Sequence, residues 1–250
     1  MSKLLNKVAV ITGGNSGIGF GIAEAFKNEG AKGVIVGRNP ETLARSVAQL
    51  GDNFIGLQAD VTNLVDLDRV FQETADKFGK IDVLVANAGG GAVGTVATLS
   101  EADFDQTIDL NLKSVYFTVR QALPYLQDGS CIILIGSNAA HRAYPNFTLY
   151  GAAKAAVIYF AKGFSSDLLA RKIRVNVITP GTTDTPAFDK FVPADQLEGL
   201  KKHFAGEMPI GRIGQPADIG KAALFLASDD SAFLLGAEIL VDGGMTYLAK

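Results

Sequence analysis

Tyr150 and Lys154 stand four residues apart in the sequence Tyr-Gly-Ala-Ala-Lys, and Ser137 precedes the tyrosine by thirteen positions. On a helix, residues at positions i and i+4 lie on the same face. The phenol and the ammonium group would therefore be neighbours, and a phenol beside a cation can exchange a proton with a substrate oxygen. The spacing predicts acid–base chemistry, although a tyrosine and a lysine in this order also occur by chance.

Tyr150 is the candidate acid for reduction of a ketone, in which carbon receives hydride and oxygen receives a proton. An isolated tyrosine has a pKa of about 10, too high for ready proton exchange near neutrality. A lysine about 4 Å away, at an effective dielectric of about 20, would interact with the phenolate by roughly 4 kcal/mol, or about three pKa units. We expect Lys154 to lower the pKa of Tyr150, with desolvation opposing this effect.

A glycine-rich turn near the start of the chain could hold a phosphate. Residues 8–12 form an apolar, β-branched run, glycines follow at positions 13, 17 and 19, and helix-spaced apolar residues come next. Glycine lets the backbone approach a pyrophosphate, whose charge is favoured at a helix N-terminus. This order predicts a dinucleotide-binding unit, whereas a glycine trio alone would also suit a methyltransferase or a plain turn.

The end of the second predicted strand bears on the choice of cofactor. A carboxylate here would bind the 2′-hydroxyl of NAD, and an arginine would suit the 2′-phosphate of NADP. The strand ends in Val36-Gly37-Arg38-Asn39, with no acid, so we favour NADP(H). NAD(H) stays possible, because Arg38 could instead stack on adenine or face solvent.

Seven short β-branched runs alternate with stretches in which apolar residues recur at helical spacing. The predicted strands are 8–12, 33–36, 53–58, 82–86, 131–136, 174–179 and 238–241. Alternating strands and helices predict parallel pairing through right-handed crossovers. We therefore predict an α/β fold: a single Rossmann-like, doubly wound domain over residues 1–250, with a seven-stranded parallel sheet and helices on both faces.

Residues 182–215 interrupt this alternation. Prolines punctuate the segment, which carries short helical patterns but no strand. A long loop in a compact α/β domain is more often functional than idle, so we predict a substrate lid here. The alternative is an ordinary surface loop with no role in substrate binding.

Composition disfavours several other classes of protein. The net charge of −3 gives no broad basic field for nucleic acid. No apolar run is long enough to span a bilayer or to act as a signal peptide, so we expect no membrane partner and a cytoplasmic location. The single cysteine, Cys131, excludes an internal disulfide and is expected to fill the core. We assign no metal site.

Taken in order, these motifs resemble those of the short-chain dehydrogenase/reductase family, and the resemblance covers essentially the whole chain. The segment Thr12-Gly-x-x-x-Gly-x-Gly19 is similar to the cofactor loop of that family. The tail is similar as well, through Gly211-Arg212-x-Gly214-x-Pro216 and Val241-Asp242-Gly243-Gly244. The catalytic tetrad of the family is matched by Asn111, Ser137, Tyr150 and Lys154.

The resemblance implies a role for each matching residue. Lys154 would also hold the nicotinamide ribose, Ser137 would bond the substrate oxygen, and Asn111 would support a water that leads protons to Lys154. Asp60-Val61 resembles the adenine contact, Asn87-Ala88-Gly89 the turn after the fourth strand, and Pro180-Gly181 with Thr185 the loop at the nicotinamide. The residues expected to contact the cofactor are Gly13, Asn15, Ser16, Gly17, Ile18, Gly19, Arg38, Asp60, Val61, Asn87, Ala88, Gly89, Tyr150, Lys154, Pro180, Gly181, Thr183 and Thr185.

Two positions depart from the family pattern. Thr183 stands where the family often has a branched apolar residue, and Leu235 stands where a threonine commonly precedes the glycine at 236. Both departures concern local packing or the grip on the cofactor rather than the tetrad.

The residues around the tetrad predict a mostly small or apolar substrate pocket. They are Gly91, Ala92, Asn138–His141, Tyr144, Phe147, Ala187 and Phe188. Such a wall suits a moderately hydrophobic carbonyl compound or secondary alcohol, although the aromatic residues could equally be lid core. We expect His141 to be an exposed loop residue and give neither it nor His203 a proton-transfer role.

The leading functional hypothesis is an NADP(H)-linked carbonyl reductase or alcohol dehydrogenase. A 3-oxoacyl carrier-protein reductase and an NAD-linked sugar or alcohol dehydrogenase are alternatives within the class, and a dinucleotide-sensing binding protein is the non-enzymatic alternative. Members of the family commonly form homotetramers. Together with the apolar residues on the outer helices, this resemblance leads us to expect a homotetramer.

Overall fold

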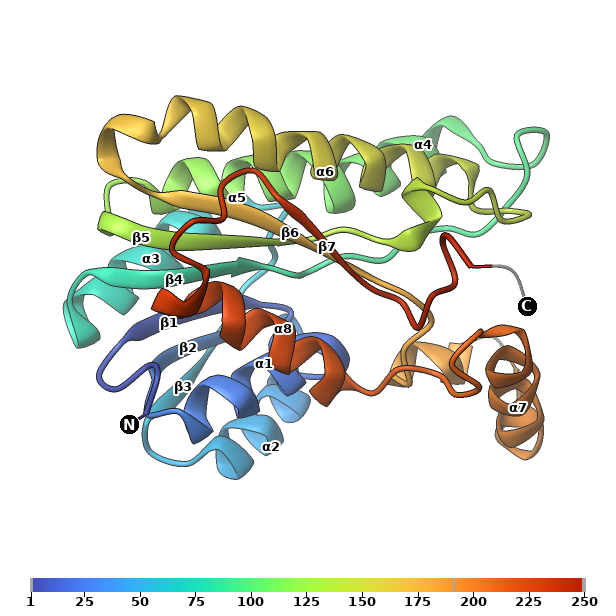
Figure 1. The fold of residues 1–250 in the computed structure, drawn as a ribbon, viewed down its shortest axis with the longest axis horizontal. Helices are drawn as coiled ribbons and strands as arrows, with labels where there is room; N and C mark the ends of the chain where they lie inside the picture. The colour runs from blue at the N-terminus through green and yellow to red at the C-terminus, as the bar shows by residue number, and fades with distance from the viewer. Residues whose placement is uncertain (1, 191, 249–250) are drawn as a thin grey trace.

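The computed structural model describes residues 2–190 and 192–248 of the chain. Its seven strands form one parallel sheet in the order β3-β2-β1-β4-β5-β6-β7 (Figure 1). The strands are β1 (Val8–Thr12), β2 (Lys32–Gly37), β3 (Phe54–Gln58), β4 (Ile81–Ala86), β5 (Leu126–Ile135), β6 (Arg174–Pro180) and β7 (Glu238–Val241). The predicted doubly wound α/β fold is therefore confirmed.

Strand β5 begins at Leu126, whereas the sequence predicts a start at Cys131. The extra residues include the exposed Gln127, Asp128 and Gly129, which break the apolar run that marks the rest of the strand. The pairing with β4 is also irregular here, since its register shifts between Ile81 and Val83. A polar, irregular strand end of this kind has no periodic signal in the sequence.

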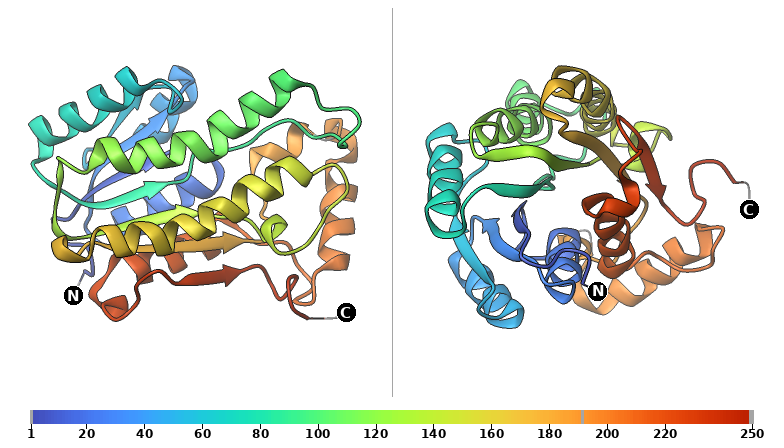
Figure 2. Two further views of the ribbon diagram at one scale, coloured as in Figure 1. Left: turned by 90° about the horizontal axis from the view of Figure 1, so that it is seen from above. Right: turned by 60° about the vertical axis from the view of Figure 1, so that its left-hand side comes forward.

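Helices cover both faces of the sheet, as the two views in Figure 2 show. One layer contains α3 (Leu64–Phe78), α4 (Glu101–Ile108), α5 (Ser114–Ala122) and α6 (Thr148–Asp167); the other contains α1 (Gly17–Asn28), α2 (Pro40–Leu50) and α8 (Pro216–Ala227). Successive strand residues point to opposite faces, so Val10 lies in one core and Ile11 in the other. The near-continuous apolar strands follow from burial on both faces.

The strand order places a topological switch point between β1 and β4. From β1 the chain winds outward through β2 and β3, then returns to add β4 on the other side of β1. In open α/β sheets, ligands bind outside the carboxyl ends of the strands at such a point. The glycine loop after β1 and the segment that begins at Asn87 after β4 meet there.

The lid segment, residues 182–215, contains the helix α7 (Leu197–Glu207), which stands apart from both helical layers (Figure 1). Two short 3₁₀ turns precede it, η4 (Pro186–Lys190) and η5 (Ala194–Gln196). Among the described residues of the segment no strand forms, and an isolated parallel bridge joins Thr183 to Gly214. In the described part of the chain, no helix has the length and apolar character needed to cross a membrane.

Candidate active site

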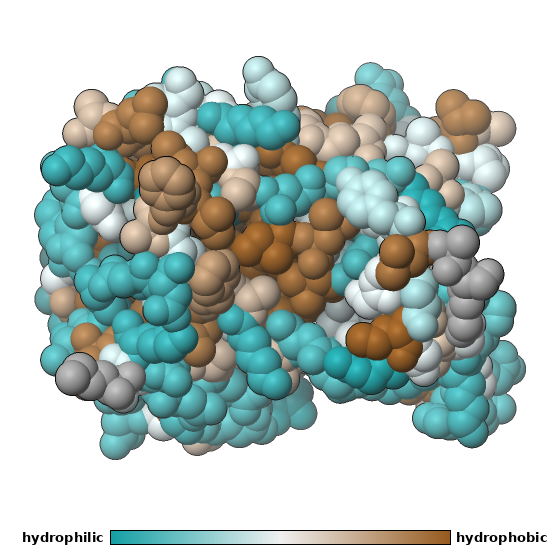
Figure 3. Space-filling view, viewed as in Figure 1, coloured by the Kyte–Doolittle hydropathy of each residue, from teal (hydrophilic) through white to brown (hydrophobic). Residues whose placement is uncertain are grey.

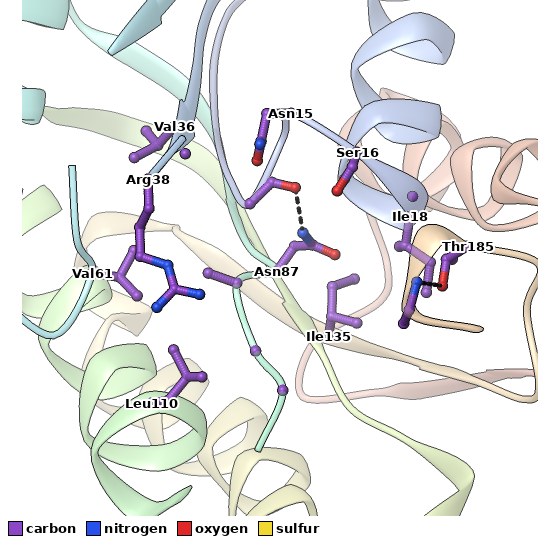
Figure 4. Close-up of a pocket in the computed structure, with 18 of the residues that line it drawn as sticks. Asn15, Ser16, Ile18, Val36, Arg38, Val61, Asn87, Leu110, Ile135 and Thr185 are labelled. Atoms are coloured by element: carbon purple, nitrogen blue, oxygen red, sulfur yellow. Dashed lines mark hydrogen bonds between the residues drawn. The ribbon is translucent and has the colours of Figure 1, made fainter. Parts of the chain in front are cut away.

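A cavity of about 870 Å³ opens at the carboxyl ends of the strands (Figure 4). The predicted site residues that line it are Gly13, Asn15, Ser16, Gly17, Ile18, Gly19, Arg38, Asp60, Val61, Asn87, Ala88, Gly89, Ser137, Tyr150, Lys154, Pro180, Gly181 and Thr185. Residues far apart in sequence thus meet in one place. Two predicted site residues, Asn111 and Thr183, are not part of the wall.

The glycine loop has the backbone geometry of a phosphate cradle. Gly13 and Gly17 have φ values of 64° and 51°, a region that residues with a Cβ rarely adopt. A Cβ at Gly19 would lie 2.2 Å from the carbonyl oxygen of Gly13. The loop leads directly into α1, whose N-terminus favours negative charge, so these residues fit a pyrophosphate.

Asn87 and Thr12 hold this loop against the end of β4. The Asn87 side-chain amide donates to the carbonyl oxygens of Thr12 at 2.8 Å and Gly13 at 3.2 Å. The Thr12 hydroxyl accepts from the backbone N–H groups of Asn87 at 3.0 Å and Ala88 at 3.1 Å. Asn87 therefore shapes the cradle, and Thr12 is a positioning residue that the predicted site omits. The sequence signal that could have found Thr12 is a polar residue at the end of an apolar strand.

The far end of the cavity carries the expected adenosine contacts. Arg38 is exposed, and its guanidinium extends past Val61 in Figure 4. No carboxylate among the described residues forms an ion pair with it. The Asn15 amide donates to the Thr42 hydroxyl at 2.7 Å, which fixes the loop beside the start of α2.

Asp60 organises the turn after β3. Its carboxylate accepts from the backbone N–H and the hydroxyl of Thr62, at 2.9 and 2.8 Å. Its own N–H donates to the Asp66 carboxylate at 2.9 Å. These bonds hold Asp60 and Val61 at the cavity wall.

Lys154 lies at the opposite end of the cavity, with only 3% of its surface exposed. Its Nζ donates to the carbonyl oxygen of Ile135 at 2.9 Å and stands 5.7 Å from the centre of the Tyr150 ring. Burial lowers the pKa of Lys154 to about 8, because the protein interior disfavours the charged form. The ammonium group is still largely protonated at neutral pH.

The pKa of Tyr150 is raised, whereas we expected Lys154 to lower it. Burial raises its pKa, and a hydrogen bond with Ser137 opposes that shift without cancelling it. Lys154 does not bring the pKa down in this state, since desolvation dominates and its Nζ is engaged by Ile135. Tyr150 is therefore a neutral phenol near neutral pH and can act as a proton donor.

Asn111 is fully buried in a π-helical turn, η1 (Asp109–Lys113), between α4 and α5. Its side-chain oxygen accepts from the Gly90 N–H at 3.0 Å, and its amide donates to the carbonyl oxygens of Thr107, at 2.9 Å, and Gly90. A Cβ at Gly89 would lie 3.0 Å from the Asn111 oxygen and 3.3 Å from the Lys154 ammonium. Both side chains therefore border Gly89. π-Helical turns are often found at functional sites.

The start of the lid closes over the glycine loop. A Cβ at Gly17 would lie 3.0 Å from the Thr185 side chain, and Pro186 and Ala187 join the cavity wall. Thr183 instead donates its hydroxyl to the Gly181 carbonyl at 3.0 Å and supports the base of the lid.

Several pocket predictions need correction or refinement. His141 is exposed, as expected, and its Nε2 lies 2.6 Å from the Glu238 carboxylate. The sequence could not indicate this contact, because the partner lies on β7. Phe188 is buried, with its ring edge-on to Phe204 at 5.7 Å, which favours the lid-core interpretation. His203 is exposed on α7.

The cavity wall also contains residues that the sequence did not single out as site residues. They are Val36, Gly37, Asn39, Pro40, Ala59, Gly90, Leu110, Ile135, Gly136 and Pro186. Gly37, Ala59, Ile135 and Gly136 end a strand or directly follow one, and that position was the signal that could have found them. Among the described residues, no group of three or more His, Cys, Asp or Glu side chains could hold a metal ion.

Comparison with known proteins agrees with this geometry. The family model described as enoyl-(acyl carrier protein) reductase matches residues 13–246. The chain belongs to the short-chain dehydrogenase/reductase family, as its motifs predict. The protein is therefore an oxidoreductase of this family, and membership implies a nicotinamide dinucleotide cofactor.

Individual relatives match over nearly the full length. An oxidoreductase from Sarocladium schorii is 38% identical, covering 99% of both chains. A hydroxynaphthalene reductase-like protein from Metarhizium majus is 35% identical, covering 97% of this chain and 96% of its own. The crystal structure of a Brucella melitensis short-chain dehydrogenase/reductase, titled glucose/ribitol dehydrogenase, superposes with a TM-score of 0.91 at 33% identity, covering 99% of both chains.

Proposed function

We propose that the protein interconverts a carbonyl compound and a secondary alcohol with NADP(H). The observation that carries this proposal is the shared cavity, which has a glycine cradle at one end and Ser137, Tyr150 and Lys154 at the other. One cavity can therefore hold a dinucleotide and present an acid to the atoms that react.

The bound nicotinamide would supply the hydride in reduction and accept it in oxidation. Tyr150 gives its phenolic proton to the substrate oxygen as the carbonyl becomes an alcohol, and the proton is later replaced from solvent. Ser137 donates a hydrogen bond to the same oxygen. Lys154 places a positive charge near the phenolate left behind, with its Nζ 5.7 Å from the ring centre, although in this structure the charge does not offset the effect of burial on the Tyr150 pKa. Asn111, which borders Gly89 as Lys154 does, would support the route by which the proton returns.

The preference for NADP(H) rests on Arg38, whose exposed guanidinium can pair with the 2′-phosphate. The glycine loop would hold the pyrophosphate, and Asp60 and Val61 would border the adenine. Replacing Arg38 with alanine should lower the ratio of kcat/KM for NADPH to that for NADH. An unchanged ratio would refute this part of the proposal.

The substrate end of the cavity favours an uncharged, partly apolar carbonyl compound. Gly90, Pro186 and Ala187 line the same cavity as Ser137, Tyr150 and Lys154. Arg142 is committed elsewhere, since it donates to the Met245 carbonyl at 3.2 Å and its guanidinium lies over the Tyr144 ring. This arrangement disfavours docking of an acidic carrier protein at Arg142. The name of the Metarhizium relative suggests that hydroxynaphthalene-derived ketones belong in the first substrate panel.

We also propose that the whole chain forms one catalytic domain, with residues 182–215 as the substrate lid. Cys131 is buried, and burial raises the pKa of its thiol to about 11, so it is a core residue rather than a nucleophile. A single inert cysteine suits a reducing compartment such as the cytoplasm.

The decisive experiment replaces Tyr150 with phenylalanine, which keeps the ring and removes the acid. Reduction of ketones from the panel should fall by at least about a thousandfold, while NADPH binding, followed by fluorescence, stays within about threefold. Retained binding would show that the cavity is intact. Activity equal to that of the unmodified protein would contradict the mechanism.

A further inference from the structure

A small apolar cluster lies apart from the two main cores, beneath the lid. Its buried members are Met208, Ile213 and Met245, and packed against them are Tyr144, Phe204 and Ala205. Tyr144 comes from the loop that follows Ser137, Phe204 and Ala205 come from α7, and Met245 comes from the C-terminal segment. We call this group the lid cluster. It brings the catalytic loop, the lid and the end of the chain into contact.

The hydroxyl of Tyr144 makes a specific contact at the edge of the lid cluster. The side-chain amide of Asn138 donates to it at 2.9 Å, and Asn138 is buried, with 7% of its surface exposed. Burial raises the pKa of Tyr144, so its hydroxyl stays neutral over the physiological range. The bond connects the lid cluster to the residue directly after Ser137.

Asn138 begins the short 3₁₀ turn η2 (Asn138–Ala140), which sets the orientation of Ser137. The Ser137 hydroxyl accepts from the Ala139 N–H at 3.2 Å. The carbonyl oxygen of Asn138 accepts from the N–H groups of His141 and Arg142, each at 3.0 Å. A shift of Asn138 would therefore carry the turn, and with it the Ser137 hydroxyl.

The opposite side of the lid cluster reaches the cavity wall. The Phe204 ring meets the Phe188 ring edge-on at 5.7 Å, and Phe188 directly follows Ala187, which lines the cavity. Arg142 fixes the Tyr144 ring from another side, with its guanidinium 5.7 Å from the ring centre. The Phe188–Phe204 ring pair, the buried residues of the lid cluster, the Tyr144 ring and its bond to Asn138 thus form a continuous connection from the cavity side of the lid to the residue after Ser137.

We propose that Tyr144 is a positioning residue for Ser137: its hydroxyl holds Asn138, and its ring ties that bond to the packing of the lid. This inference rests on the proposed function, in which Ser137 bonds the substrate oxygen. The position of the lid then affects the reaction at the substrate oxygen.

Tyr144→Phe keeps the ring in the lid cluster and removes only the bond to Asn138. We expect kcat for ketone reduction to fall by about three- to tenfold, the equivalent of one neutral hydrogen bond, with KM for NADPH unchanged. The matched control is Tyr125→Phe, because the Tyr125 hydroxyl also bonds an amide side chain, that of Gln72, at 3.0 Å and lies beyond the other end of β5. The control should keep its kcat.

A double-mutant cycle separates positioning from general loss of stability. If Tyr144 acts through Asn138, then adding Tyr144→Phe to Asn138→Ala should change kcat by less than about twofold. A second arm, Phe204→Leu, should lower kcat in the unmodified background and have a smaller effect beside Tyr144→Phe. Equal, independent effects in both backgrounds would overturn the proposal, as would unchanged kcat in Tyr144→Phe.

The outcome also separates this inference from the proposed function. If Tyr150→Phe is inactive while Tyr144→Phe reacts normally, the mechanism stands and the positioning role fails. If Tyr150→Phe is fully active, the mechanism itself fails, and the role of Tyr144 fails with it. A lowered melting temperature without a change in kcat counts against positioning, since it indicates a purely structural role.

Discussion

At the scale of single residues, Lys154 is an ammonium group held almost entirely out of water. Its Nζ donates a hydrogen bond to the Ile135 carbonyl, and burial lowers its pKa from 10.5 to about 8. A buried charge of this kind costs stability, yet the proposed mechanism needs it beside the phenolate. Functional sites commonly hold groups that the fold alone would not favour.

The stability cost of Lys154 should be measurable as a function of pH. Its folded pKa lies below its unfolded pKa, so the cost is fully present below about pH 8 and disappears as the pH rises to about 10.5. The lowered pKa of Lys154 corresponds to a destabilisation of the folded protein by about 3 kcal/mol. Replacing Lys154 removes this cost but also removes its hydrogen bond to Ile135, which contributes about 1 kcal/mol. Lys154→Met should therefore raise the free energy of unfolding by about 2 kcal/mol at neutral pH while abolishing reduction.

Denaturant unfolding at several pH values checks this expectation. Lys113→Met is the control, since Lys113 is 56% exposed in its pair with Asp109, and its loss should change stability by less than about 0.5 kcal/mol. A stability difference for Lys154→Met that does not shrink with rising pH would show that desolvation of the charge is not its cause.

At the scale of elements, glycines let α1 and α8 pack unusually closely. A Cβ at Gly220 would lie 2.5 Å from the carbonyl oxygen of Gly21, and a Cβ at Gly21 would lie 2.6 Å from Pro216. The helix that begins at the phosphate cradle is therefore held in place by α8, on the same face of the sheet.

Gly220→Ala should destabilise the protein by about 1–3 kcal/mol, because backbone rather than a flexible side chain meets the new methyl group. The matched control is Gly199→Ala in α7, where a Cβ would meet nothing within 4 Å. The control should be neutral or more stable by up to about 1 kcal/mol, since alanine is the better helix former. Thermal unfolding compares the two, and equal stabilities would contradict close packing as the reason for Gly220.

The sequence was sufficient for some elements and not for others. All seven strands were predicted, because apolar β-branched runs bounded by turns are a local signal. The predicted start of β5 was wrong, because the first residues of the strand are mostly polar and pair irregularly with β4. The contact of Thr12 with Asn87 and the place of Leu110 in the cavity wall depend on segments that only the assembled fold brings together.

At the scale of the whole molecule, exposed apolar side chains gather on two surfaces. On the outer helices, Tyr116 packs against Phe160 and Phe164, and Tyr159 beside them is 69% exposed. Near the free edge of β7, Phe233 is fully exposed and Leu235 is 46% exposed. Figure 3 shows hydrophobic residues gathered in the middle of this second face, over β7. Large exposed apolar patches mark interaction surfaces.

Two self-complementary surfaces on one chain generate a tetramer with dihedral symmetry, so we propose a homotetramer. Light scattering after size exclusion should give about four times the mass of the chain. Phe233→Glu should break the contact at β7 and halve that mass. Val65→Glu, at a position that is 75% exposed on α3, is the control and should leave the assembly intact. A monomeric unmodified protein would exclude the proposal.

By itself, the sequence determined the class of fold and the position of the glycine loop, since both depend on residue spacing along single strands, turns and helices. It also predicted Ser137, Tyr150 and Lys154 as site residues, and all three line the cavity. Only the tertiary structure decided that burial raises the pKa of Tyr150, that His141 pairs with Glu238 and that Tyr144 holds Asn138. These features depend on desolvation and on contacts between distant segments, which a one-dimensional pattern does not contain.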